Sequence, residues 1–114
     1  MDAIEIVLLY DYYGDLLTDR QKECFELRYY QDLSLGEIAS ELGISRQGVH
    51  ENLGRAEALL RNMETKTGSV KRDQACRKAA DAILEAATQL RQVDHPAVPA
   101  LAERIISAVE SIEE

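Results

Sequence analysis

Residues that break helices are scarce in this sequence of 114 residues, and so are apolar segments that could hold a chain in a membrane. It has no tryptophan, one phenylalanine, two prolines and six glycines, so few residues break helices. Its beginning, MDAIEIVLLYDYYGD, lacks the basic start of a signal peptide, and no apolar run approaches transmembrane length. We therefore expect no leader and no membrane segment, and the length predicts a single domain with a modest core.

An excess of positive charge is also absent. The chain has 13 basic and 21 acidic residues, which gives a net charge of −8. Because affinity for DNA depends largely on neutralising phosphates, we expect weak non-specific DNA binding at physiological salt. Residues 45–63 differ from this average, with three arginines against two glutamates.

Signals of catalysis or metal binding are missing. Cys24 and Cys76 are 52 positions apart, without a CxxC motif or a nearby histidine, so a disulfide framework and a zinc site are not predicted. We expect two buried thiols in a cytoplasmic protein. His50 and His95 are isolated, and the sequence has no Gly-rich phosphate loop and no nucleophile motif. We predict no enzyme, no cofactor and no metal site.

Apolar spacing and capping residues predict helices with readable ends. A first helix covers residues 3–13 and ends at Gly14. Its apolar stripe consists of Ile4, Val7, Leu8 and Tyr12. Thr18 caps a second helix, and Ser34 with Glu37 three positions later forms a capping box for a third, short helix.

The third and fourth helices are joined by a tight turn. Gly43 suits the left-handed backbone of that turn, and Ser45 caps a fourth helix that runs to about Lys66. The residues expected to form their shared core are Ile38, Leu42, Ile44, Val49 and Leu53. This spacing is typical of a helix-turn-helix, whose second helix enters the major groove of DNA. An ordinary corner of a helical bundle is the alternative.

The run LTDRQKECFELRYYQDLSLGEIASELGISRQGVHENLGRAEALL resembles region four of bacterial sigma factors. More closely, residues 7–67 resemble the YlxM family of small helix-turn-helix proteins, through LLYDYYGDLLT, RYYQDLSLGEIA, ISRQ and RAEALL. The resemblance implies an all-helical fold in which residues 45–66 form the recognition helix. It also implies an association with the signal recognition particle pathway, because such proteins are typically encoded beside its GTPase. A regulatory role in that pathway is proposed for the family.

The candidate DNA contacts follow from this frame. With Val49 and Leu53 turned inward, the residues that face outward and are candidates for base contacts are Arg46, Gln47, His50 and Glu51. The candidates for phosphate contacts are Ser45, Arg55, Arg20 and Lys22. Where the family tends to read SRQAVYDN, this chain reads SRQGVHEN, so Gly48 weakens the helix and His50 replaces an aromatic residue.

Two further apolar stripes follow in the C-terminal part. The stripe within residues 73–93 consists of Cys76, Ala79, Ile83, Ala86, Leu90 and Val93. The stripe within residues 98–112 consists of Val98, Ala102, Ile105, Val109 and Ile112. Their heptad spacing, with Pro96 and Pro99 between them, predicts a helical hairpin. The hairpin either covers the N-terminal helices of its own chain or pairs with another chain.

These observations predict an all-α protein. A helix-turn-helix core of four helices in residues 1–68 is followed by a hairpin in residues 69–114. The expected function is binding of double-stranded DNA by a cytoplasmic regulatory homodimer, linked to the signal recognition particle pathway. The alternatives are an adaptor that binds components of that particle directly, and a self-associating helical module without a nucleic-acid role.

Overall fold

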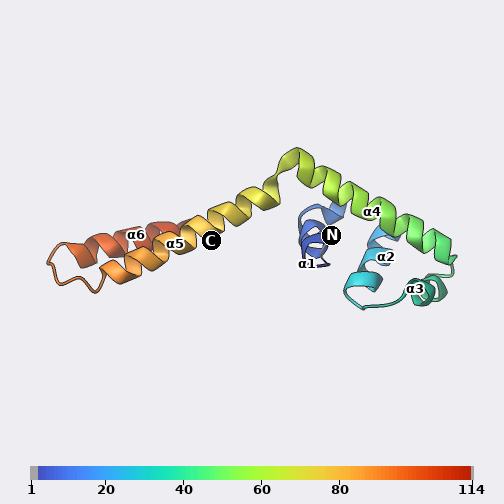
Figure 1. The fold of residues 1–114 in the computed structure, drawn as a ribbon, viewed down its shortest axis with the longest axis horizontal. Coiled ribbons are helices and arrows are strands. Elements are labelled where there is room, and N and C mark those ends of the chain that lie inside the picture. The colour runs from blue at the N-terminus through green and yellow to red at the C-terminus, as the bar shows by residue number, and fades with distance from the viewer. Residues whose placement is uncertain (1–2, 114) are drawn as a thin grey trace. The chain divides into compact units, whose positions relative to one another are not determined.

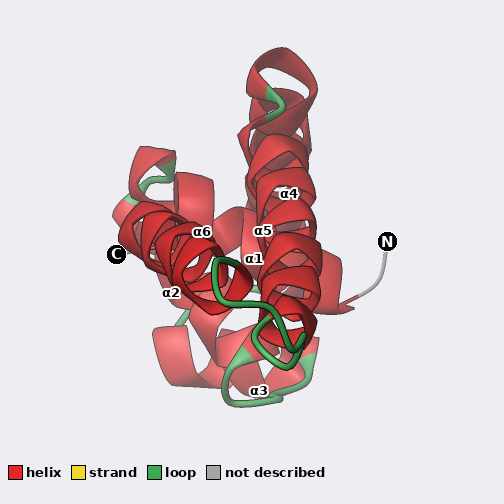
Figure 2. Ribbon diagram, turned by 90° about the vertical axis from the view of Figure 1, so that its left-hand side faces the viewer, coloured by secondary structure: helices red, strands yellow, loops and turns green. Residues whose placement is uncertain are grey.

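The computed structural model describes residues 3–113 and forms helices joined by short connections. In chain order these are α1 (Ala3–Tyr13), the 3-10 helix η1 (Gly14–Leu16), α2 (Asp19–Tyr29), α3 (Leu35–Leu42), α4 (Arg46–Thr67), α5 (Ser69–Leu90) and α6 (Val98–Glu113). Residues 3–113 contain no β-strand, as the colouring of Figure 2 shows. The predicted all-α class is confirmed.

The chain divides into two compact units, one ending at Val70 and the other beginning at Lys71. The first unit holds α1 to α4, and the second holds α6 and nearly all of α5. Within the second unit, α5 and α6 run side by side in opposite directions and are joined by residues 91–97 (Figure 1). The predicted helical hairpin is therefore present.

The helix ends lie where the capping residues place them. The Thr18 hydroxyl accepts a hydrogen bond from the Gln21 N–H, and the Gln21 side chain accepts one from the Thr18 N–H, which completes a capping box. Ser34 and Glu37 form the same reciprocal pair at the start of α3. These bonds satisfy N–H groups that a helix cannot pair internally, so the helices begin at defined residues.

The core of the first unit consists of two adjoining clusters of buried side chains. The larger joins α1, α2 and α4 and is built on Ile6, Leu9, Tyr13, Leu17, Phe25, Ala56, Leu60 and Val70. The smaller joins α2, α3 and α4 and is built on Cys24, Ile38, Ala39, Val49 and Leu53, with Leu42 and Ile44 packed against it. The predicted shared core of α3 and α4 is confirmed, and Cys24 is an addition to it.

The prediction of which face of α1 is buried is wrong. The structure buries Ile6, Leu9 and Tyr13, whereas Ile4 on the predicted stripe is 77 % exposed and Tyr12 is also exposed. The segment AIEIVLLYDYY is apolar on almost every side, so helical spacing alone does not select one face. Contact with Phe25 and Leu60 in the larger cluster selects it instead.

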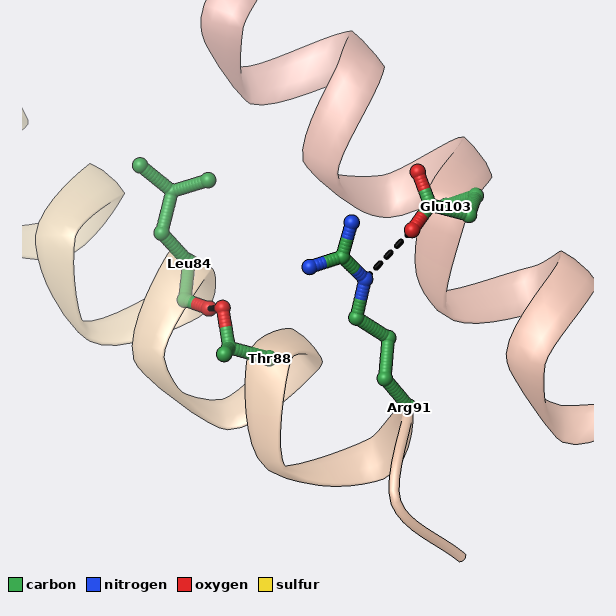
Figure 3. A network of polar contacts seen from close by, with 4 residues as sticks. All are labelled: Leu84, Thr88, Arg91 and Glu103. Carbon is green, nitrogen blue, oxygen red and sulfur yellow. Dashed lines mark hydrogen bonds and ion pairs between the residues drawn. The ribbon is translucent and has the colours of Figure 1, made fainter.

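The hairpin is joined at its loop by an ion pair between Arg91, the first residue after α5, and Glu103 on α6. Arg91 donates a hydrogen bond from Nε to Glu103 Oε1 on α6, as Figure 3 shows. In the same view the Thr88 hydroxyl donates to the Leu84 carbonyl at 2.7 Å, so this polar group is satisfied within α5. Both groups of the ion pair are about half exposed, so it contributes little to stability.

The hairpin buries a different stripe of α5 from the one that heptad spacing predicts. Its buried side chains are Ala87, Ala102 and Val109. On α5 the predicted stripe is exposed from Cys76 to Leu90, and Val93 beyond the helix is exposed as well. The prediction that both thiols are buried is therefore wrong for Cys76. Apolar residues lie on more than one side of α5, so packing against α6 decides which stripe is buried.

Candidate nucleic-acid interface

The turn between α3 and α4 has the geometry of a helix-turn-helix. Gly43 ends α3 with φ 69° and ψ 34°, a left-handed conformation that a residue with a side chain adopts only at a cost. The Ile44 N–H then donates to the Ala39 carbonyl at 3.1 Å, which satisfies a carbonyl at the end of α3. The chain thus reverses within three residues and begins α4 directly after Ser45.

Ser45 is the N-terminal cap of α4. Its hydroxyl oxygen accepts a hydrogen bond from the Gly48 N–H at 2.9 Å. A Cβ built on Gly48 would lie 3.2 Å from that oxygen, so glycine leaves room for the cap. The buried face of α4 consists of Val49, Leu53, Ala56 and Leu60. The opposite face therefore points away from the core of its own unit.

The four predicted base-contacting residues lie at the start of α4 but on different sides of it. At about 100° per residue, Gln47 and Glu51 lie opposite the buried stripe, whereas Arg46 continues that stripe at its N-terminal end and His50 lies beside it. Arg46, Gln47, His50 and Glu51 all lie within its first two turns, and all four are exposed. Gln47 and Glu51 contact each other through Nε2 and Oε1 at 3.5 Å, one helical turn apart. This long contact on an exposed helix face is weak, so both side chains can exchange it for another partner.

The guanidinium of Arg46 lies against the backbone of α3 at Gly36. A Cβ built on Gly36 would lie 2.8 Å from Nη2 of Arg46 and 3.0 Å from its Nε. Any side chain at this position would push the guanidinium away, whereas glycine lets it rest on the helix. No pattern in the sequence indicates this contact, because it joins two helices across the turn. The contact with Gly36 restricts the directions in which Arg46 can donate hydrogen bonds. Arg46 nevertheless remains exposed.

Three of the four predicted phosphate contacts already have partners within the chain. Arg20 donates from Nη1 to the Leu42 carbonyl at 3.5 Å, near the end of α3. Lys22 lies 3.6 Å from a carboxylate oxygen of Asp15. Ser45 acts as the cap of α4, and Arg55 lies exposed farther along the same helix. Of the four, Arg55 lies on α4 with the candidate base contacts, and Ser45 directly precedes that helix as its cap.

Charge is distributed unevenly over the first unit. A groove beside α2 and α3 combines an apolar floor with three carboxylates, and its lining consists of Glu23, Glu26, Leu27, Tyr30, Gln31, Glu41 and Leu42. Such a surface repels a phosphate backbone. The exposed arginines of α4 lie outside this groove, so the first turns of α4 are the part of the unit best suited to approach DNA.

The remaining reactive groups of the first unit serve packing. Burial raises the pKa of the Cys24 thiol, so it stays protonated in the core between α2 and α4. Burial, together with a hydrogen bond to Glu57, raises the pKa of Tyr29 to about 12. Tyr10 stacks on Phe25 with ring centroids 4.2 Å apart. These groups support the core that holds α4 in place.

The described part of the chain shows neither a metal cluster nor a helix that could span a membrane. Among residues 3–113, no group of three or more histidine, cysteine, aspartate or glutamate side chains could hold a metal ion. No helix in that range combines the length and the apolar character needed to cross a bilayer.

Comparison with known proteins agrees with this geometry. Residues 2–97 match the model of a family described as "Putative helix-turn-helix protein, YlxM / p13 like". A UPF0122 protein of Thermoanaerobacter sp. (strain X514) is 43 % identical over 112 residues, which cover 97 % of this chain and 96 % of the relative. A UPF0122 protein of Caldanaerobacter subterraneus subsp. tengcongensis is 51 % identical over 84 residues, covering 74 % of this chain and 72 % of the relative.

Proposed function

Because the chain belongs to the family of helix-turn-helix proteins like YlxM and p13, we propose that it is a regulatory protein that binds double-stranded DNA through α4. One observation carries this proposal. The first two turns of α4 expose Arg46, Gln47 and His50, while Val49, Leu53, Ala56 and Leu60 hold the same helix in the core. A helix held in this way can enter the major groove without losing its own packing.

Each exposed group on α4 matches a feature of DNA. Arg46 can donate two hydrogen bonds to guanine, and Gln47 can pair in the same way with adenine. His50 and Glu51 follow one turn later and reach the next bases. Ser45 at the positive end of the helix, together with Arg55, suits phosphate contacts, which position the helix without reading sequence. Arg20 and Lys22 contribute to phosphate binding only after exchanging their present partners.

The net charge of −8 limits how much phosphate contacts contribute to the affinity of such a protein for DNA. Phosphate neutralisation supplies little affinity here, so base contacts carry a larger share of the binding free energy. Two copies reading paired half-sites compensate for weak single-site affinity, and we include homodimer formation in the proposal. The protein acts in the cytoplasm, where an exposed thiol such as Cys76 stays reduced.

The experiment is a selection of bound duplexes from a random DNA library, followed by anisotropy titrations at several salt concentrations. The wild-type chain should enrich a defined motif and bind it with a shallow salt dependence. Arg46→Ala with Gln47→Ala should abolish the sequence preference and leave the helical circular dichroism unchanged. Sequence preference that survives in this double variant contradicts the assigned reading face.

A second candidate is an adaptor that binds a protein or a ribonucleoprotein. The acidic, apolar-floored groove beside α2 and α3 favours it, since this surface suits a basic partner. The resemblance to YlxM points to components of the signal recognition particle as that partner, and to a regulatory role in its pathway. Absence of any DNA motif, together with saturable binding to the purified GTPase of the particle, would replace the DNA proposal with this one.

A further inference from the structure

The hairpin of α5 and α6 uses only part of its apolar surface for its own packing. Its inner stripes consist of Ala80, Leu84 and Ala87 on α5, and Val98, Ala102, Ile106 and Val109 on α6. Three of these seven side chains are buried and four are half-buried. Two helices cannot cover each other on more than one side, so any further apolar stripe remains open to solvent.

Each helix carries such a second stripe. The set that we call the outer apolar face consists of Cys76, Ala79, Ile83, Ala86 and Leu90 on α5, Val93 just beyond it, and Leu101, Ile105, Ala108 and Ile112 on α6. All ten residues are exposed, and Ile112 reaches 78 %. The steps of three and four residues within each stripe are those of helices that pack side by side.

The two exposed stripes lie on the same side of the hairpin. At 100° per residue, the exposed stripe of α5 lies about a quarter turn from its inner stripe. The exposed stripe of α6 lies about a quarter turn from its own inner stripe, in the same rotational sense. Because the two helices run in opposite directions, equal rotations turn both stripes toward one side of the hairpin. They form one continuous surface and not two opposite ones.

We propose that the outer apolar face pairs with the same face of a second copy of this chain, forming a four-helix bundle from two hairpins. The face is large enough for such a dimer. The 22 residues of α5 span about 33 Å, and two adjacent helices present a surface about 20 Å wide. Two such faces bury roughly 1,300 Å² in total, which is within the range of stable protein interfaces.

The charge distribution along α5 favours an antiparallel pairing of the two copies. Residues 71–78 contain four basic residues and one acidic residue, whereas residues 79–90 contain two acidic residues and no basic one. A two-fold axis across the middle of α5 brings the basic end of each copy toward the acidic end of the other. At one end of the face, Cys76 and Ile112 border a hollow whose remaining lining is Ala80 and the charged residues Asp73, Arg77 and Asp81.

The test is the mass of the whole chain in solution without DNA, measured by sedimentation equilibrium. The wild type should have twice the chain mass of 12.8 kDa at micromolar concentration. Ile83→Glu with Ile105→Glu places charges at the centre of the outer apolar face and should return the mass to that of one chain. The matched control, Gln89→Glu with Ser107→Glu, adds the same charges away from the face and should remain dimeric.

Mass alone does not show which surfaces meet, so a second measurement locates the contact. A spin label on Gln89→Cys, in a Cys76→Ser chain, is mixed with unlabelled ¹⁵N chain. Broadening should appear in the hairpin amides of the unlabelled copy. A wild type that is monomeric at all concentrations overturns the proposal, because the face is then covered by its own chain or left open. A Glu double variant that remains dimeric, or broadening confined to residues before Val70, overturns it equally.

Discussion

The two units of this protein differ in how completely they bury their apolar side chains. Among the described residues, thirteen apolar side chains are buried up to Val70, and three are buried from Lys71 onward. The first unit closes its core within itself and presents a polar helix face at α4. The hairpin leaves apolar side chains exposed on one side. The first unit thus closes its core and leaves a polar face of α4 to solvent, whereas the hairpin leaves an apolar face that we propose a second copy covers.

The largest expected effect comes from comparing an isoleucine-to-alanine substitution in the core of the first unit with the same substitution in the hairpin. Ile38→Ala, at a fully buried position between α3 and α4, should lower the free energy of unfolding of the first unit by about 2–5 kcal/mol. Ile83→Ala, at a side chain that is 46 % exposed, should cost the hairpin less than about 1 kcal/mol in the monomer.

Hydrogen exchange followed by mass spectrometry separates these two effects, because it reports each unit on its own. The measurement is made at a concentration below that at which the chain associates. Equal losses of amide protection in the two variants would show that the two units do not differ in how completely they bury these side chains.

The next effect concerns the turn that holds α4. Gly43→Ala forces a side chain into the left-handed conformation and should destabilise the first unit by about 1–2 kcal/mol. Gly54→Ala serves as its control, since a Cβ there meets nothing within 4 Å and alanine favours the helix by up to about 1 kcal/mol. Urea unfolding followed by circular dichroism should therefore shift in opposite directions. A neutral Gly43→Ala variant would mean that the turn does not need its glycine.

A smaller effect tests whether α3 helps to aim Arg46. Gly36→Ala should displace the guanidinium and weaken binding to the selected DNA motif several-fold, with little change in stability. In an Arg46→Ala background the same substitution should have no further effect on binding. The four titrations form a double-mutant cycle, and additive losses would show that Gly36 acts independently of Arg46.

The smallest effect concerns the capping box of α3. Hydrogen bonds from Ser34, its backbone N–H foremost, hold the pKa of Glu37 below its ordinary value of 4.5. Because the folded-state pKa is lowered, this stabilisation is present above pH 4.5 and is lost as pH falls through the folded value. Glu37→Gln keeps an acceptor oxygen and should lack this part of the acid sensitivity. The check is the urea midpoint of the wild type and of Glu37→Gln, measured from neutral pH to below pH 4.5. If the two midpoints fall in parallel with pH, Glu37 does not contribute to the acid sensitivity.

Local signals predicted most of the first unit. Capping by Thr18, Ser34 and Ser45 depends on residues three positions apart, and the left-handed turn depends on Gly43 alone. Such features follow from the sequence because no distant residue decides them. The candidate face of α4 could be outlined in the same way, since the spacing of its buried residues leaves one side for the polar ones.

The predictions that were wrong, on the buried faces of α1 and α5 and on Cys76, share a different cause. Both α1 and α5 carry apolar residues on more than one side, so tertiary packing chooses which stripe is buried. Cys76 is exposed because α5 turns another stripe toward α6. The contact of Arg46 with Gly36, and the pairing of Lys22 with Asp15, join separate elements and have no local signature.

The central claim is that the first turns of α4 form the surface that meets DNA. Its most direct test is a titration of the ¹⁵N-labelled full chain with the selected duplex, followed by amide chemical shifts. The account predicts that the largest shifts cluster between Ser45 and Arg55, with the acidic groove beside α2 and α3 unchanged. Shifts that cluster on that groove or on the hairpin, with α4 unaffected, would contradict it.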